Sequence, residues 1–317
     1  HILFLLAALS LYFLIFRLFK SKPLACLAFI MLVCMPRIYA HSFFNSKDIP
    51  MLSMYLITLS VSHWVFGRGK LLRYVLLGML AGYTTSIRIP GLILAVLLAG
   101  YMVVDIISDI ASKRRPGRSL SALGLFAAGF LVMLYAAWPY LWEHPFANFA
   151  ESYAAMAHFH WTGDVFYRGA FIASTALPLN YFPTWFFITV PELWLIAGLA
   201  GIVLVIYNTA RRPMQHITNT TDRFIVLALL CFAAPVAAVL LLHSVIYDDW
   251  RHLYFIYPSF LIMVIYAISK VQAAKFRMAI LGLCVVQLTW TGYFMVKSHP
   301  IEQVYFNAYV PHSDEYL

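Results

Sequence analysis

The sequence predicts an all-α integral membrane protein, and three observations lead to this class. Of its 317 residues, 63% are hydrophobic and only 11% are charged, with a mean hydropathy of +0.81; these values lie far outside those of soluble domains. The apolar residues fall into about ten long runs, as expected for helices that cross a bilayer. The basic residues concentrate in alternate connections between these runs, as in multi-pass membrane proteins. We therefore expect one polytopic membrane domain over residues 1–317.

Each apolar run is expected to form a membrane helix. A spanning helix needs about 20 apolar residues and tolerates somewhat fewer. Pro36 interrupts the second run, since proline lacks the backbone N–H that a continuous helix requires. In chain order the runs are 2–16, 24–40, 51–66, 71–87, 91–107, 119–137, 193–207, 224–246, 253–269 and 278–296.

The charges assign the connections to two sides of the membrane. One set of connections holds 16 of the 22 Lys and Arg residues, and the positive-inside rule makes this side cytoplasmic. The other set holds 10 of the 13 acidic residues, although acids play no part in that rule. We therefore expect the reactive groups on the non-cytoplasmic side.

Residues 138–192 form the largest predicted outer loop. Its aromatic residues with interspersed charges predict short amphipathic helices in the membrane interface, where Trp and Tyr are favoured. An aromatic belt would by itself explain most of the tryptophans. His158 and His160 would diverge on a helix, so only an extended segment would direct both toward one metal. The loop residues that could contact a substrate are Trp138, Trp142, Glu143, His158 and Asp164.

Residues 41–50, with the sequence HSFFNSKDIP, are a polar segment between two apolar runs. His41 offers a base, Lys47 a cation and Asp48 a carboxylate. Such groups beside lipid are energetically costly and often functional. Asp48 could instead cap the following helix, which has Pro50 in its first turn. The two roles are compatible.

A second polar segment, residues 243–252, precedes the ninth run. The guanidinium group of Arg251 suits a phosphate because its donors form a fixed fork and stay charged. Alternatively, Arg251 forms an interfacial salt bridge with Asp248 or Asp249. Arg88 lies at a tight outer turn between two runs, where a cation should face a polar cavity rather than lipid.

Four stretches together resemble glycosyltransferase family 39, the group of the dolichyl-phosphate-mannose protein mannosyltransferases and the bacterial lipid A aminoarabinose transferases. The resemblance spans nearly the whole chain, and the first and fourth stretches are the more specific. The four stretches are residues 41–50, the Arg-Ile-Pro-Gly turn at 88–91, residues 138–142 leading through 178–183, and residues 247–258.

The resemblance implies the membrane core of a type C glycosyltransferase. Such an enzyme moves a sugar, here a mannose-like hexose or an aminopentose, from a polyprenyl-phosphate donor to a lipid, glycan or protein acceptor. The transfer takes place on the non-cytoplasmic face of a bacterial inner membrane or an endoplasmic reticulum. The family's base is an acid of the first outer loop, and the assisting Asp of the second is matched by Asp48. The first acid has no counterpart here. We therefore expect a fragment that lacks the first helix, the first outer loop and any C-terminal outer domain, and that is incomplete for catalysis.

The resemblance also implies roles for single residues. Asp48 and His41 would be catalytic and could also bind a divalent metal ion, although oxygen and imidazole ligands do not demand one. Arg251, Arg88, His252 and Lys47 would bind the phosphate of the donor.

Two other functions compete with this interpretation. One is a transporter or flippase of a lipid-linked sugar, whose polar site would lie near the bilayer midplane. The other is a non-catalytic membrane scaffold. The sequence contains no internal repeat, Gly-rich phosphate loop or nucleophile elbow, so soluble nucleotide binding is disfavoured, and we expect no nucleic-acid partner.

Overall fold

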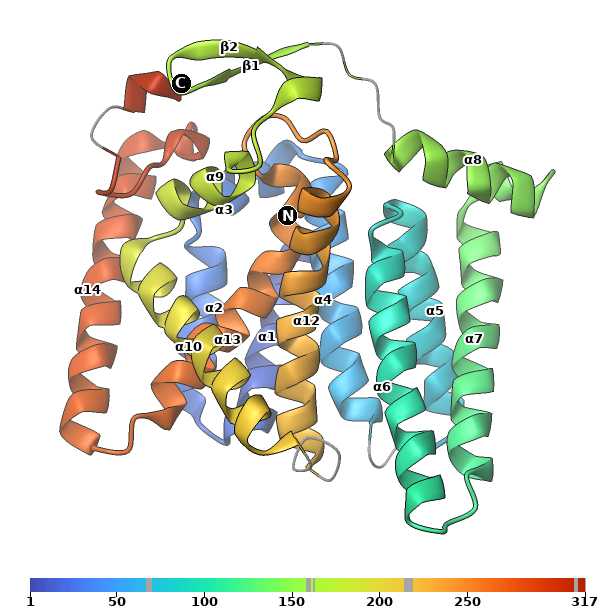
Figure 1. The fold of residues 1–317 in the computed structure, drawn as a ribbon. Coiled ribbons are helices and arrows are strands. Elements are labelled where there is room, and N and C mark those ends of the chain that lie inside the picture. Colours follow the sequence, from blue (N-terminus) through green and yellow to red (C-terminus); the bar gives the residue numbers. More distant parts are fainter. Residues whose placement is uncertain (67–69, 158–160, 162, 214–218, 311–312, 317) are drawn as a thin grey trace.

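The fold is a bundle of long helices with smaller elements gathered at one end (Figure 1). The structure is a computed structural model, which describes residues 1–66, 70–157, 161, 163–213, 219–310 and 313–316. The α-helices are α1 (Ile2–Phe19), α2 (Lys22–Val33), α3 (Pro36–Phe44), α4 (Asp48–Val65), α5 (Leu72–Ile87), α6 (Gly91–Ala111), α7 (Gly117–Ala137), α8 (Pro145–Ala157), α9 (Tyr181–Thr189), α10 (Glu192–Arg211), α12 (Thr220–Leu241), α13 (Tyr257–Lys270) and α14 (Ala274–Ser298). The remaining elements are β1 (Asp164–Tyr167), β2 (Ala170–Ala173) and the 3-10 helices η1 (Pro139–Leu141), η2 (Ser174–Ala176), η3 (Arg251–Ile256), η4 (Glu302–Val304) and η5 (Ser313–Glu315).

The predicted class, an all-α membrane protein, is confirmed. Within the described residues, seven helices are long and apolar enough to cross a membrane, or eight if the bent pair α2–α3 forms one span. This number is lower than the ten that the sequence predicts, because α4 and α5 fall short. Helix α5 has only 16 residues, and α4 carries hydroxyl side chains, of which Thr58 lies 3.1 Å from Thr84 of α5, Oγ1 to Oγ1.

The ends of the helices agree with the pattern of charge. The helix ends that flank the basic connections lie together at the lower end of the bundle in Figure 1. The upper end carries the N-terminus, α3, α8, the two strands and the C-terminal segment. The two polar segments that the sequence singles out, residues 41–50 and 243–252, therefore lie at the same end.

Helix α13 lies at the centre of the protein. The span from Arg251 to Lys270 is 83% buried, whereas the other six spans are 17–39% buried. Helix α10 packs closely against α13, since Gly201 of α10 lies so near the backbone of Met263 that a Cβ at this position would collide with it. Arg251 is the first residue of this largely buried segment.

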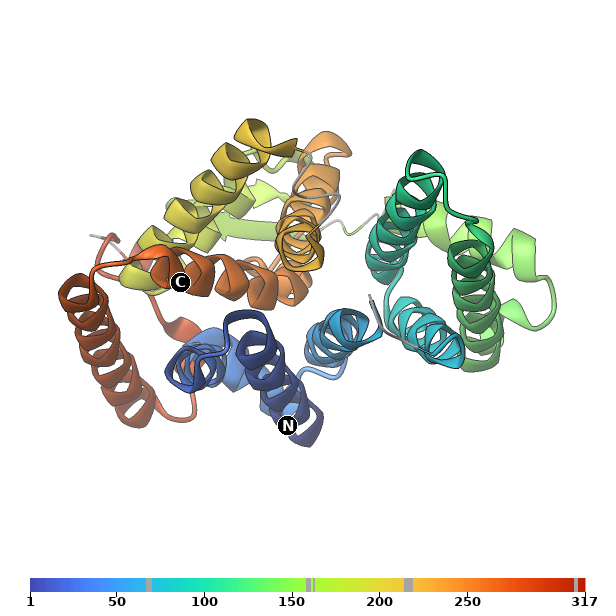
Figure 2. The same ribbon diagram turned by 90° about the horizontal axis from the view of Figure 1, so that it is seen from below.

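Helices α5, α6 and α7 form a separate group at one side of the bundle (Figure 2). Helices α5 and α7 approach to backbone contact, since a Cβ at Gly78 would meet Phe126 of α7 and a Cβ at Gly129 would meet Val75 of α5. Arg88 lies in the turn that joins α5 to α6, and so belongs to this group.

Residues 138–192, the predicted outer loop, contain an element that the sequence does not predict. Helices α8 and α9 are the kind of short helix expected there, but strands β1 and β2 form an antiparallel hairpin between them, with Tyr167 opposite Ala170. The turn residues Arg168 and Gly169 have φ values of 55° and 75°, as a type I′ turn requires. The two-residue turn with glycine after β-branched and aromatic residues is the signal that could have predicted it.

Candidate active site

Asp48 begins helix α4 but does not cap it through its side chain. The N-cap residue is Lys47, whose side chain makes no capping hydrogen bond. Instead, the Asn45 Oδ1 atom accepts a hydrogen bond of 2.8 Å from the Asp48 backbone N–H. The capping role considered for the Asp48 carboxylate is therefore not observed, and its oxygens are free for other partners.

The Asp48 carboxylate bridges two arginines. Its Oδ1 atom forms an ion pair with Nη1 of Arg88, and its Oδ2 atom lies 3.1 Å from Nη1 of Arg251. The Asn45 side chain donates a further hydrogen bond of 2.8 Å to Oδ2. The Asp48 side chain is only 1% exposed, and a carboxylate so buried requires this compensation. The structure thus joins three predicted site residues from three separate segments.

The two guanidinium groups form a local concentration of positive charge. Burial, followed by the charge of the neighbouring Arg251, lowers the pKa of Arg88. The ion pair considered for Arg251 is also present, since its Nε atom lies 2.7 Å from Oδ2 of Asp248. The Asp248 side chain is 67% exposed, so this pair contributes little stability.

The predicted histidines flank this cluster. The His41 Nδ1 atom lies 3.1 Å from Nδ2 of Asn45, so His41 reaches Asp48 through Asn45. The His252 ring packs edge-on against Tyr247, with the ring centroids 4.7 Å apart. Lys47 is exposed.

A buried ion pair behind the cluster was not predicted. The Arg37 Nη1 atom lies 2.9 Å from Oδ2 of Asp249, and its Nε–H donates to the Tyr305 carbonyl at 3.0 Å. The Tyr254 hydroxyl donates to the same Asp249 oxygen at 3.0 Å. Burial raises the pKa of Asp249, and the Arg37 guanidinium opposes this effect. An arginine next to Pro36 inside an apolar run is the signal that could have identified the pair.

This ion pair holds the loop that precedes Arg251. Asp248 and Asp249 have φ values of 60° and 61°, a left-handed conformation that Asp tolerates better than most residues. The Arg37 guanidinium also lies against two rings, 5.1 Å from the Trp185 centroid and 4.8 Å from that of Phe306. Asp249 is thereby anchored to α3 while its neighbour Asp248 faces Arg251.

Two cavities meet at this cluster. An apolar cavity of about 770 Å³ lies between the α5–α6 turn and α12, and its lining includes Arg88 and His252. A polar cavity of about 510 Å³ is lined by His41, Arg251 and both aspartates of the loop, among others. Tyr247 lines both cavities, and Trp161 stacks on its ring at a centroid distance of 4.3 Å. The ionic cluster therefore lies at the boundary between an apolar and a polar compartment.

The residues expected in the substrate loop are dispersed. Trp138 lines the apolar cavity and Asp164 the polar one. Trp142 is 54% exposed, and its indole N–H donates to the Tyr135 carbonyl at 2.7 Å. Glu143 is exposed and lines neither cavity. His158 lies outside the described residues, as does His160.

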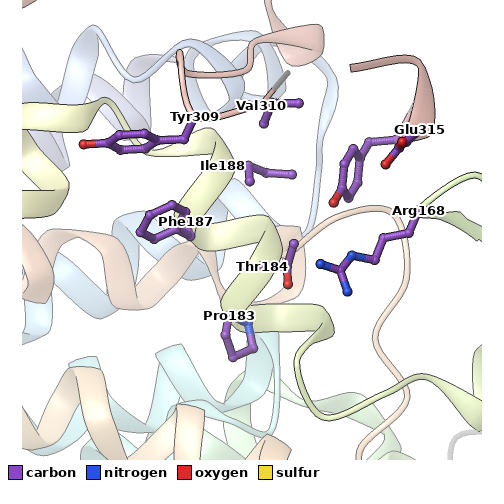
Figure 3. Close-up of a pocket in the computed structure, with 9 residues that line it drawn as sticks. Arg168, Pro183, Thr184, Phe187, Ile188, Tyr309, Val310 and Glu315 are labelled. Atoms are coloured by element: carbon purple, nitrogen blue, oxygen red, sulfur yellow. The ribbon is translucent and has the colours of Figure 1, made fainter. Parts of the chain in front are cut away.

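A third cavity, of about 540 Å³, lies outside this cluster, between α9 and the C-terminal segment. Arg168 and Glu315 face Phe187 and Tyr309 across it (Figure 3). It shares Tyr316 with the polar cavity, but no residue of the Asp48 cluster lines it. It is therefore a separate feature at the upper end of the bundle in Figure 1.

His41 and Asp48, the possible metal ligands, are not part of a larger cluster of ligands in the described residues. Among the residues that the structure describes, no group of three or more His, Cys, Asp and Glu side chains is placed to bind a metal ion. Both oxygens of Asp48 face guanidinium groups. His41 and Asp48 therefore do not together form a cation site.

Residues 1–141 match the family model described as dolichyl-phosphate-mannose-protein mannosyltransferase. The predicted resemblance to this family is confirmed. The match includes His41, Asp48 and Arg88 and ends before Arg251, and it supports a membrane glycosyltransferase of the mannosyltransferase type. Neither a curated protein nor a solved structure matches the chain.

Proposed function

We propose that the protein transfers a sugar from a polyprenyl-phosphate donor to an acceptor on the non-cytoplasmic face of its membrane. The main support is the order of compartments at the site: an apolar cavity, two arginines and a polar cavity follow one another. The donor has the same order of parts, an apolar tail, an anionic phosphate and a polar sugar.

The apolar cavity suits the prenyl tail. It lies between helices of the α5–α7 group and α12, and its lining includes Ile93, Val96, Leu97, Ala234 and Ala238. A prenyl chain in this position gains the same apolar contacts as it has among the acyl chains of the bilayer. The tail therefore enters from lipid, while the phosphate remains at the helix ends.

Arg88 and Arg251 suit the phosphate. The acceptor oxygen attacks the anomeric carbon, and the bond from this carbon to the phosphate oxygen breaks with inversion. The electron pair of that bond leaves with the phosphate, where guanidinium groups stabilise the added negative charge. A base must take the proton of the acceptor hydroxyl. Within this chain, Asp48 and His41 are proposed to orient that acceptor.

The polar cavity suits the sugar and the acceptor. Its walls offer hydrogen-bonding groups and the stacked pair of Trp161 and Tyr247. It lies at the end of the bundle opposite the basic connections, which favours the non-cytoplasmic face. A flippase would instead place its polar site near the bilayer midplane, whereas the Asp48 cluster lies at the helix ends.

The test uses protein expressed from its complete coding sequence and reconstituted in vesicles with a radiolabelled polyprenyl-phosphate sugar. Arg251→Ala is expected to reduce transfer by about 100-fold, the usual effect of losing one group that stabilises developing charge. Arg168→Ala is the matched control because Arg168 lies at the exposed hairpin turn and should leave transfer unchanged. Unchanged kinetics of Arg251→Ala would remove this residue from the site. Movement of labelled lipid across the bilayer without transfer would favour a flippase.

A further inference from the structure

The Asp48 carboxylate occupies the arginine nitrogens that the phosphate would use. Each of its two oxygens pairs with Nη1 of a different guanidinium, Oδ1 with Arg88 and Oδ2 with Arg251. Two oxygens of a phosphate would bridge the arginines in the same way, because both anions are recognised by the same N–H fork. The carboxylate and a phosphate therefore compete for the same hydrogen-bond donors.

The charges strengthen this competition. The two arginines carry two positive charges, and Asp48 and Asp248, which pair with them, carry two negative ones. The cluster is therefore balanced without a further anion. A phosphate held by both arginines would lie next to the Asp48 carboxylate, where like charges repel strongly because water is largely excluded. Asp48 is 1% exposed, whereas the Arg88 and Arg251 side chains are 27% and 21% exposed, so the arginines remain reachable.

Asn45 contacts both the backbone and the carboxylate of Asp48, independently of the arginines. The Asp48 backbone N–H is held by Asn45 Oδ1 at 2.8 Å, and Asn45 Nδ2 donates to the Asp48 carboxylate at 2.8 Å. The same Nδ2 atom lies 3.1 Å from Nδ1 of His41, which lines the polar cavity. The hydrogen bond from the Asp48 backbone to Asn45 does not involve the carboxylate, so it would hold the start of α4 even if the carboxylate left the arginines.

We propose that Asp48 is an internal competitor of the donor phosphate, an inference that rests on the proposed function. In the absence of donor, its carboxylate occupies Nη1 of both Arg88 and Arg251. Binding of the phosphate displaces it from Arg88 and Arg251 and turns it toward the polar cavity, where it orients the acceptor. Binding is consequently ordered, with the donor before the acceptor, because Asp48 becomes available to the acceptor only after the phosphate has taken the arginines.

The experiment measures binding of farnesyl phosphate, a short prenyl monophosphate, to the purified protein by calorimetry. Asp48→Asn keeps the shape of the side chain and removes its charge, so we expect binding about tenfold tighter than in the wild type. Asp48→Ala should show the same direction of change, which guards against an effect peculiar to the amide. Sugar transfer by both variants should fall although they bind the phosphate more tightly.

Glu143→Gln is the matched control. It removes one negative charge from an exposed carboxylate that lines neither cavity, so its effect on binding should stay below about twofold. Thermal unfolding of each variant shows that it is folded.

Equal or weaker binding by Asp48→Asn would overturn the proposal, because Asp48 would then organise the arginines rather than compete for them. The proposed transfer would survive this result if the wild type binds and consumes the donor. A folded wild type that does not bind farnesyl phosphate, with Arg88→Gln indistinguishable from it, would instead reject the phosphate site itself.

Discussion

Removing Arg37 is expected to destabilise the protein strongly, because it leaves Asp249 buried without its cation. The two side chains are each 6% exposed and joined at 2.9 Å. Breaking such a buried pair from one side costs about 3–5 kcal/mol. Arg37→Met removes the guanidinium and leaves an unbranched neutral side chain next to Trp185 and Phe306. We therefore expect it to lower the free energy of unfolding by about 3–5 kcal/mol.

A double-mutant cycle separates the ion pair from general packing damage. Asp249→Asn retains an acceptor for the Tyr254 hydroxyl and tolerates the left-handed backbone at this position. The double variant Arg37→Met with Asp249→Asn should be more stable than the sum of the single effects predicts, by about 2 kcal/mol. Unfolding is followed by SDS titration in detergent micelles. Additive effects within about 0.5 kcal/mol would refute the coupling.

The pH dependence provides an independent check on the same pair. Burial raises the pKa of Asp249, and Arg37 is the largest effect opposing it. In Arg37→Met the pKa of the folded state should therefore rise further above that of the unfolded chain. Protonation then favours the folded state, so the stability lost in this variant should be partly regained as the pH falls through the folded-state pKa. A deficit that is independent of pH would contradict an uncompensated carboxylate.

Two further predictions concern packing and the apolar cavity. Gly201→Ala should lower the free energy of unfolding by about 1–3 kcal/mol, because its Cβ would meet the Met263 backbone. Gly100→Ala is the control: its Cβ would meet nothing within 4 Å, so this variant should be neutral or stabilising. Equal effects of the two substitutions in thermal unfolding would contradict the close approach of α10 and α13. Val96→Trp should raise the KM for a long-chain donor by about tenfold through steric exclusion from the cavity that Val96 lines. Val103→Trp, on the same helix but outside this lining, should not, and a similar rise in both variants would argue against the tail site.

The elements of the fold follow closely from local sequence. Each of the ten apolar runs overlaps a helix, and the break that Pro36 predicts appears as the 61° bend between α2 and α3. Fewer helices qualify as spans than the sequence predicts. One reason is that α4 packs mainly against protein and not lipid, so it can carry hydroxyl side chains, such as Thr58, that pair with partners such as Thr84. The hairpin after residue 163 was missed because its strands have only four residues each, too few for alternation to be distinctive.

The sequence by itself determined which side chains are exceptional. A carboxylate at Asp48, guanidinium groups at Arg88 and Arg251 and a histidine at His41 are recognisable because charge beside lipid is costly wherever the chain folds. Only the tertiary structure decided how they are paired. Arg251 reaches Asp48 across 203 positions of sequence, and Arg37 reaches Asp249 across 212. These pairings depend on how the helices pack around α13. Hydropathy reports whether each helix prefers lipid or protein, but it carries no information about which helix ends meet.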